Sequence, residues 1–261
     1  MDSPTYSICI TLYNNAPTVR RALDSILAQI DNRFEIVAVD NFSTDGTKQI
    51  LTEYAEAGKI NTLVEKHCSR GLGRRIAVEN SKGQYIIADM DMDDEFKPEL
   101  ANLLRFYHSK CEGFILAAVG EIKGATYEER MATKNVTIGP RDFILELGNW
   151  PDLQAYEDSN LWGRAALGNR YAWTIFSLVR TAGGHPERMS TLGKVRFRYV
   201  RYRDLYRQGR ITVVEKERKG ASGRVALVLA RVAAPFYRSY VRTTFTTFRP
   251  RDMPYFVNFE P

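Results

Sequence analysis

Short apolar runs alternate with amphipathic stretches through the first half of the chain. The runs at 6–12, 34–39, 60–64 and 85–88 are rich in aliphatic and β-branched residues, and their length suits strands better than helices. Uninterrupted apolar runs of this kind are typical of strands that are buried on both faces of a sheet. We therefore expect four such strands.

Helix-type patterns fill the intervals between these runs. Pro17 suits the first turn of a helix. The apolar positions after it fall on one stripe: Val19, Leu23, Ile26, Leu27 and Ile30. Turn-forming residues at 41–46 lead into a second helix that extends through Tyr54, and Pro98 opens a further one. This alternation predicts an α/β fold with a mostly parallel, doubly wound sheet.

The segments that follow three of the expected strands are polar. Residues 11–15, 40–45 and 89–95 come directly after the first, second and fourth strands, and the last two segments are acidic. In doubly wound sheets, ligands bind beyond the carboxyl ends of the strands. We therefore expect a functional site where these three segments meet.

The acidic segment 89–95 holds five carboxylates in seven residues. Carboxylates this close repel one another and raise each other's pKa unless a cation or hydrogen-bond donors compensate them. A hard divalent ion, Mg²⁺ or Mn²⁺, that also binds a diphosphate fits this chemistry. The alternative is an acidic turn that caps the helix beginning at Pro98.

Residues 70–75, Arg-Gly-Leu-Gly-Arg-Arg, combine a flexible backbone with three guanidinium groups. Glycines let backbone N–H groups approach a phosphate, and arginine supplies paired donors. The segment lacks both the dinucleotide-binding fingerprint and the lysine of a P-loop. It indicates a phosphate contact chiefly because it lies just upstream of the acidic segment.

Glu157 and Asp158 form a carboxylate pair in an aromatic segment, 156–162, which follows Leu-Gly-Asn-Trp-Pro at 147–151. A carboxylate beside bulky rings is partly desolvated, which makes it a better base for a sugar hydroxyl. The alternative is a helix N-terminus, where acidic residues favour the helix dipole.

These segments together resemble glycosyltransferase family 2, the inverting enzymes of the GT-A fold. The matching stretches are ICITLYNNAPTVRRALDSILAQ, IVAVDNFSTDGT, RGLGRRIAVENSKGQYIIADMDMDDEFKPEL and LGNWPDLQAYEDSNLWGR, in the family's order over roughly residues 5–165. The resemblance implies a GT-A catalytic domain over 1–190, with a nucleotide-sugar half at about 1–95 and an acceptor half at about 96–190. A C-terminal extension, 191–261, follows.

The resemblance implies that the donor is a nucleotide-sugar, carrying UDP or GDP. Thr11 and Asp40 would contact the nucleoside, and Arg74 or Arg75 would face the phosphates, although the family's usual Arg-Asn pairing is missing there. With the glycine-arginine segment included, the candidate donor-binding residues are Thr11, Asp40, Arg70, Gly71, Arg74, Arg75 and Asp91.

The resemblance also implies a site for Mn²⁺ or Mg²⁺. Asp91 and Asp93 match the family's Asp-x-Asp, with Asp93 the expected metal ligand and Asp91 nearer the ribose or the sugar. Asp94 matches the acid that follows, and the extra Asp89 leaves the register ambiguous by two residues. His185 is the further candidate ligand, although a lone histidine in a Gly-Gly-His-Pro segment is more often structural.

Asp158 matches the family's catalytic base, with Glu157 as its paired acid. Gly148 resembles the small residue of the acceptor-side loop, and Trp150 lies beside it. The Gln-x-x-Arg-Trp motif of processive synthases is absent, so we expect transfer of a single sugar to a glycan or lipid-linked acceptor hydroxyl. An alternative is transfer onto a polyprenyl phosphate, which would need no strong base.

Composition is ordinary for a globular protein, with 44% hydrophobic residues. The three cysteines have no paired spacing, which indicates a reducing compartment and neither a disulfide framework nor a zinc cluster. The N-terminal apolar run predicts a first strand and not a signal peptide. No apolar stretch reaches the ~20 residues of a membrane-spanning helix. We expect a cytoplasmic protein, with peripheral attachment to the membrane as an option.

Charge is unevenly distributed along the chain. Residues 1–187 hold 20 Lys and Arg against 26 Asp and Glu, whereas residues 188–261 hold 17 against 5. A basic tail suggests an anionic partner, either a membrane surface, nucleic acid or a phosphorylated acceptor, and the alternative is a solvated basic face. A rival outside enzymes is a catalytically inactive basic nucleic-acid-binding protein with this fold, but the intact acidic segment speaks against it and no recognisable nucleic-acid motif supports it.

Arginines 224, 231, 238 and 242 form one helical stripe in this tail, beside an apolar face of Val225, Leu229, Val232 and Phe236. This pattern is typical of a helix that lies on an anionic membrane, with Pro235 as a kink or a restart. The alternative is a helix packed on the catalytic domain or on another subunit.

Overall fold

The computed structural model describes residues 3–119, 135–176, 178–182, 191–207, 220–233 and 255–256. The strands are β1 (Tyr6–Leu12), β2 (Phe34–Asp40), β3 (Thr62–Glu65), β4 (Tyr85–Ala88), β5 (Asp94–Phe96), β6 (Ile115–Val119), β7 (Asn135–Pro140), β8 (Tyr171–Ile175), β9 (Val179–Ala182) and β10 (Tyr255–Phe256). The helices are α1 (Val19–Leu27), α2 (Thr47–Glu56), α3 (Arg70–Glu79), α4 (Leu100–Lys110), α6 (Arg141–Glu146), α7 (Glu157–Leu167), α8 (Thr191–Arg207) and α10 (Gly220–Ala233).

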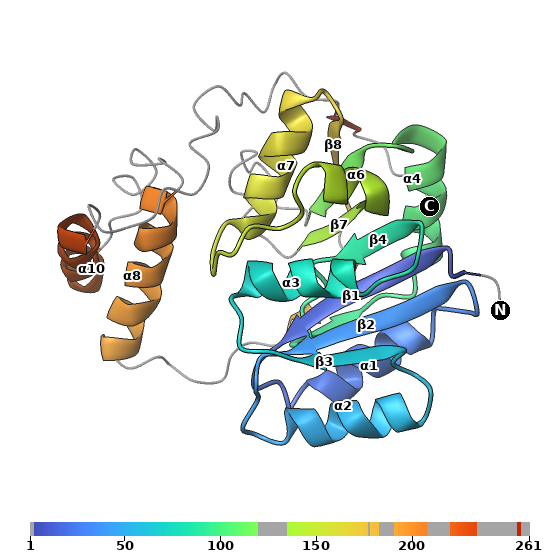
Figure 1. Ribbon diagram of the computed structural model, residues 1–261, viewed down its shortest axis with the longest axis horizontal. Coiled ribbons are helices and arrows are strands. Elements are labelled where there is room, and N and C mark those ends of the chain that lie inside the picture. Colours follow the sequence, from blue (N-terminus) through green and yellow to red (C-terminus); the bar gives the residue numbers. More distant parts are fainter. Residues whose placement is uncertain are drawn as a thin grey trace.

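Eight of these strands form one sheet in the order β10-β8-β6-β7-β4-β1-β2-β3 (Figure 1). Every pairing is parallel except the two made by β7, which runs antiparallel to β4 and β6. β1 and β2 pair in register from Tyr6 opposite Phe34 to Leu12 opposite Asp40. The carboxyl ends of these two strands therefore lie side by side, as the sequence predicted.

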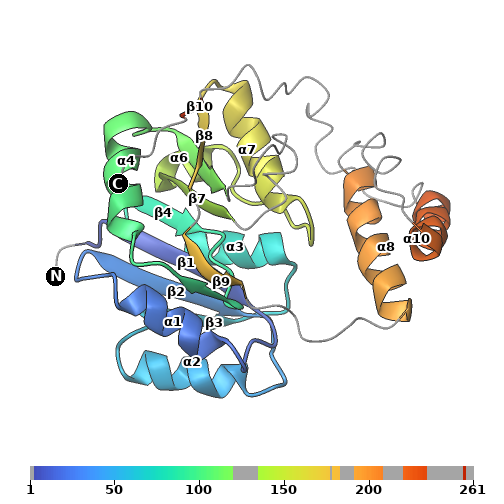
Figure 2. The ribbon, with the colours of Figure 1, turned by 180° about the vertical axis from the view of Figure 1, so that it is seen from behind.

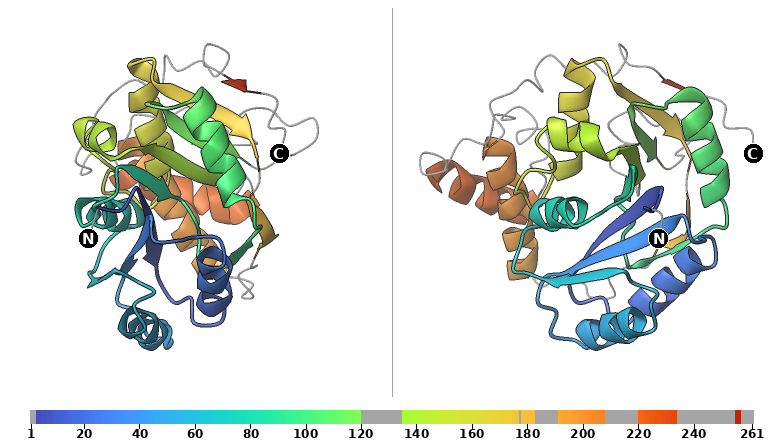
Figure 3. Two further views of the ribbon diagram at one scale, coloured as in Figure 1. Left: turned by 90° about the vertical axis from the view of Figure 1, so that its right-hand side faces the viewer. Right: turned by 45° about the vertical axis from the view of Figure 1, so that its right-hand side comes forward.

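Helices cover both faces of the sheet (Figure 3). Successive residues of a strand therefore pack in different hydrophobic cores, one on each face. Ile8 and Ile10 of β1 pack with α1, α2 and α4, whereas Cys9 between them packs with α3, α6 and α7. This alternation follows from the two-residue repeat of a strand. It explains why the predicted strands are apolar throughout, and it confirms the mostly parallel, doubly wound α/β fold.

Two elements differ from the sequence-based bounds. The third strand is Thr62–Glu65 and not 60–64, and α4 begins at Leu100, two residues after the proline predicted to open it. A proline restricts the residue before it to extended conformations, and here residues 97–99 stay outside the helix. The backbone N–H of Lys97 bonds Leu178 O at 2.7 Å, next to the small sheet formed by β5 and β9.

Helices α8 and α10 pack against each other around a small core of their own: Tyr202, Leu205, Ala226, Leu227 and Ala230. Figures 1 and 2 show α8 between α10 and the sheet, so that α10 is the outer helix in both views. None of the helices among the described residues is long and apolar enough to cross a membrane.

Candidate active site

Hydrogen bonds that involve side chains connect the loop after β1 to the loop after β2. The backbone N–H of Asn14 donates to Ser43 Oγ at 2.9 Å, and that of Thr44 donates to Asn14 Oδ1 at 2.9 Å. Asp40, 1% exposed, accepts from the Oγ of Ser43 at 2.5 Å and from its backbone N–H at 3.1 Å. These bonds fix one wall of the expected donor site. The proposed contact of Asp40 with a nucleobase stays a prediction.

Two exposed aromatic residues follow β1 and β2, and the sequence analysis missed both. Tyr13 follows β1 and is 57% exposed, and Phe42 follows β2 and is 40% exposed. The Phe42 ring stacks on His67 with 4.1 Å between centroids. The sequence did contain a signal for these residues: each is an aromatic residue just after a buried strand. At that position the chain leaves the core, so the ring can be exposed and can serve as a stacking surface.

Asp91, Asp93 and Asp94 follow β4, and one carboxylate oxygen of each lies within 4.8 Å of the others. Oxygens bound to one Mg²⁺ at ~2.1 Å are about 3 to 4.2 Å apart. The three carboxylates therefore need only a small inward movement to share an ion, and their hard oxygen atoms suit Mg²⁺ or Mn²⁺. The cluster lies in the acidic segment singled out in the sequence, and its binding of an ion stays a prediction.

Asp89 belongs to the same acidic segment but lies outside the cluster of Asp91, Asp93 and Asp94. It is buried, with a φ of 67, and it pairs with Nε of Arg74 at 2.8 Å. Its other oxygen accepts from the hydroxyl of Thr137, which in turn accepts from Nε1 of Trp162 at 3.0 Å. Left-handed backbone costs a non-glycine residue ~1 kcal/mol or more, and these contacts hold it.

Residues 70–75 are not the flexible segment expected from their two glycines, because they form the start of α3. Ser69 caps this helix by accepting from the backbone N–H of Leu72 at 3.1 Å. A Cβ on Gly71 would overlap the carbonyl oxygen of Pro151, and one on Gly73 would lie 3.1 Å from Thr11. The glycines therefore serve close packing of α3 and do not free a loop.

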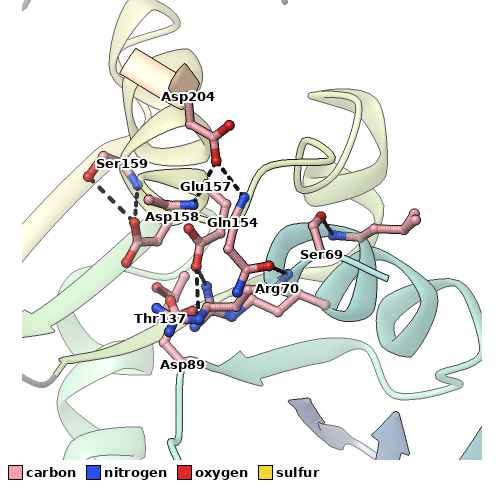
Figure 4. Close-up of polar contacts among 12 residues, drawn as sticks. Ser69, Arg70, Asp89, Thr137, Gln154, Glu157, Asp158, Ser159 and Asp204 are labelled. Carbon is pink, nitrogen blue, oxygen red and sulfur yellow. Dashed lines mark hydrogen bonds and ion pairs between the residues drawn. The ribbon is translucent and has the colours of Figure 1, made fainter. Parts of the chain in front are cut away.

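Arg74 joins the two acidic motifs. Its side chain is buried and forms ion pairs with Asp89, directly after β4, and with Glu157, at the start of α7. Figure 4 labels these two acidic residues. Burial opposes the charge of this guanidinium, but Asp89, Glu157, Asp158 and Asp91 raise its pKa. Two acidic segments far apart in the sequence thus converge on one arginine, whose donors are directed at protein carboxylates.

The two carboxylates of the Glu-Asp pair differ in burial. Glu157 is 1% exposed, and burial raises its pKa to about 7, against the opposing effect of Arg74. Asp158 is partly exposed, and its Oδ1 accepts from the backbone N–H of Ser159 at 2.6 Å. Both residues lie in the first turn of α7, so the helix N-terminus considered for this segment is also present. Glu157 anchors the helix, and Asp158 is the accessible carboxylate.

Some of the remaining candidates are exposed to solvent, whereas others are buried or hydrogen-bonded within the protein. Arg70 has a half-exposed side chain, with Nε 3.9 Å from Glu157 Oε1, whereas Arg75 Nε donates to Trp150 O at 2.8 Å. Trp150, placed in the acceptor-side loop with Gly148, is 0% exposed, and its ring packs in the core with residues of α3 and α7. Gly148 is exposed, with a φ of 87 that favours glycine.

Several residues singled out in the sequence lie outside the described residues. They are His185, Pro235, Phe236, Arg238 and Arg242.

Comparison with known proteins agrees with this geometry. The family model described as Glycosyl transferase family 2 matches residues 7–172. A poly(ribitol-phosphate) beta-glucosyltransferase of Bacillus spizizenii is 32% identical over 123 residues, 45% of this chain and 19% of that protein. The putative teichuronic acid biosynthesis glycosyltransferase TuaG of Bacillus subtilis is 31% identical over 98 residues, 37% of this chain and 38% of that protein. The chain thus matches less than two fifths of either relative's length.

Solved structures share the fold. One is mannosyltransferase PcManGT from Pyrobaculum calidifontis in complex with GDP-Man and Mn²⁺, with a TM-score of 0.61, 21% identity, and coverage of 89% of this chain and 70% of that one. Another is S. aureus TarS in complex with UDP, with a TM-score of 0.57, 17% identity, and coverage of 95% and 76%. Since the family model spans more than half of the 261 residues, and the fold and the acidic segments agree with it, the chain belongs to glycosyl transferase family 2.

Proposed function

We propose that the protein transfers one sugar from a nucleotide-diphosphate sugar to an acceptor hydroxyl, with inversion, in a reaction that depends on Mn²⁺ or Mg²⁺. The observation that carries this proposal is the convergence on Arg74 of the segment that bears Asp91 and the one that bears Asp158. One could hold a metal and a diphosphate, and the other could hold a base.

The donor side is built from the ends of β1, β2 and β4. Tyr13 and Phe42 offer exposed rings for a nucleobase next to Asp40. Arg70 is the most exposed of the three arginines of α3, and it replaces the occupied Arg74 as our candidate for the donor phosphates. When bound by Asp91, Asp93 and Asp94, a divalent ion would supply positive charge against the leaving diphosphate.

The reaction is a single displacement at the anomeric carbon. Asp158 accepts the proton of the acceptor hydroxyl as its oxygen bonds to the carbon, while the bond from that carbon to the diphosphate oxygen breaks. The electron pair leaves with the nucleoside diphosphate. Glu157 and Arg74 take no proton in this scheme, since their ion pair holds the start of α7.

The proposal is tested by thermal shift with UDP, GDP and their sugars, with and without Mn²⁺. We expect one nucleotide series to raise the melting temperature only when the metal is present, because a ligand that binds only the folded state stabilises it by mass action. A shift equally large in EDTA would contradict metal dependence, and no shift with any nucleotide would contradict the donor.

We further propose that the acceptor is a glycan or a lipid-linked molecule, and that the protein meets it at the cytoplasmic face of an anionic membrane. The outer face of α10 is apolar and exposed: Val225, Val228, Leu229 and Val232 are 48–70% exposed. Arg224 and Arg231 are exposed on the same helix. Its opposite face packs on α8, which leaves the exposed apolar face available for a membrane surface in this proposal.

Vesicle binding should follow from this surface. Arginine near an anionic surface contributes about 1 kcal/mol, so phosphatidylglycerol vesicles should bind at least roughly tenfold more tightly than phosphatidylcholine vesicles, and salt should weaken the binding. Val228→Glu with Val232→Glu should abolish co-sedimentation. Gln49→Glu with Lys48→Glu, on exposed positions of α2, is the control for added negative charge.

Two outcomes would overturn the membrane proposal. One is no vesicle binding by the wild-type protein at low salt. The other is a wild-type dimer in gel filtration that becomes monomeric in the α10 variant without any change in vesicle binding, which would assign the face to a subunit interface.

A further inference from the structure

Helix α8 contacts the catalytic part of the chain at the segment that leads into α7. Asp204 of α8 is 0% exposed, and its Oδ2 accepts the backbone N–H groups of Gln154 at 2.8 Å and of Ala155 at 3.2 Å. Figure 4 shows this carboxylate directed at the chain just before Glu157 and Asp158. The two amides are thereby satisfied by a side chain fifty residues away, because this segment belongs to no helix or strand.

A second contact from α8 holds the next residue. Arg201 Nη2 donates to the hydroxyl of Tyr156 at 2.5 Å, and its guanidinium carbon lies 5.1 Å from the centre of the Tyr156 ring. The same ring packs against the core shared by α8 and α10. Tyr156 has a φ of 61 and is the last residue before α7. Helix α8 therefore holds the left-handed turn from which α7 starts.

The composition of α8 makes Asp204 conspicuous. It is the sole acidic residue in a helix with six basic ones. Arg203 Nη2 pairs with Asp204 Oδ1 at 2.8 Å, so the buried carboxylate is compensated. Bonds from backbone N–H groups to a carboxylate are stronger than neutral hydrogen bonds, so removing this carboxylate should loosen residues 154–155.

We propose that Asp204 and Arg201 are positioning residues for the reaction: by holding residues 154–156, α8 sets the place of Asp158. This rests on the proposed function, in which Asp158 is the general base. The family match ends at residue 172, so α8 contributes from outside it. The C-terminal helices then contribute to the active site in addition to the proposed membrane binding.

The test combines kinetics with hydrogen exchange on the full-length protein. Asp204→Ala should increase amide exchange in peptides spanning 150–160 and leave those spanning 6–12 unchanged. Misplacing a catalytic group by about 1 Å can cost ~10²-fold, so turnover of the sugar nucleotide chosen by thermal shift should fall ~10- to 10²-fold. The dissociation constant of that nucleotide should change less than twofold.

Conservative and neighbouring variants separate positioning from stability. Asp204→Asn keeps an oxygen that can accept both amides, so it should restore most of the turnover. Arg201→Ala should lower turnover, whereas Arg196→Ala, at an exposed position of the same helix, should not. If Asp204→Ala does not fold, the turnover of Arg201→Ala is compared with that of Arg196→Ala. A loss in Arg201→Ala alone supports the proposal, and equal turnover of the two variants contradicts it.

Unchanged exchange at 150–160, or wild-type turnover in a folded Asp204→Ala, would overturn the inference. So would an equal loss of nucleotide affinity and turnover, because that indicates general damage. If the wild-type protein turns over no sugar nucleotide, the proposed function fails. The hydrogen-exchange measurement alone then shows whether α8 holds residues 154–156.

Discussion

Asp158→Asn is expected to lower sugar transfer by a factor of ~10²–10⁴, the usual contribution of a positioned general base. The amide has nearly the shape of the carboxylate but cannot take the acceptor proton. Donor affinity should change little, because Asp158 lies at the start of α7 and outside the cluster of Asp91, Asp93 and Asp94. The measurement is transfer, or donor hydrolysis, alongside a donor titration on the same variant.

Glu157→Gln is the matched control, since the neighbouring residue has a different environment. Glu157 is buried against Arg74, so the loss should appear mainly in stability, with a milder effect on turnover of the folded protein. Burial raises the pKa of Glu157 from 4.5 to about 7. Its proton is thus bound more tightly in the folded state, and the associated stability is present below pH 4.5 and is lost as pH rises through about 7. Glu157→Gln should flatten that part of the stability profile, and Asp158→Asn should not.

Near-normal transfer by Asp158→Asn would rule out this residue as the base. It would favour instead a polyprenyl phosphate acceptor, whose charged oxygen attacks without losing a proton.

Asp93→Ala is expected to remove most of the metal-dependent donor affinity, by ~10²-fold or more, because a metal contributes several kcal/mol of interaction with phosphate oxygens. Asp93 is partly exposed and follows β4, so the fold should survive the change. Calorimetry of UDP and GDP binding, in Mn²⁺ and in EDTA, measures the effect.

Glu95→Ala is the control for charge at this place. Glu95 lies two residues further on and contacts Arg180 at 3.4 Å, outside the three-carboxylate cluster. It should bind the donor much like the wild type. Equal nucleotide affinity of the wild-type protein in EDTA and in Mn²⁺ would contradict a metal site in this cluster.

The sequence alone predicted the first, second and fourth strands and the acidic segments at their ends. Strand burial leaves a local signature, because residues that face two apolar layers must be apolar at every position. The resemblance to a family rests on segments that are likewise contiguous, such as 85–95. It located the acidic groups correctly but left open which of Asp89, Asp91 and Asp93 share an ion.

Tertiary structure separated these carboxylates and the other candidates by their contacts. Asp89 lies outside the cluster of Asp91, Asp93 and Asp94 and pairs with the buried Arg74. Gly71 packs under Pro151, and Trp150 fills a core, because α3 and α7 meet closely there. Side-chain burial depends on what packs from elsewhere in the chain, so no local pattern reveals it.

Asp204 shows the same limit most clearly. A single acid in a basic helix was visible in the sequence, but its partners are two backbone amides at 154–155. Backbone N–H groups carry no sequence signal of their own, since every residue except proline has one. The chain by itself therefore determined the strands, the fold class and the chemistry of the acidic motifs. Only the folded structure decided which charges pair, which carboxylate stays accessible and which distant helix holds the segment before it.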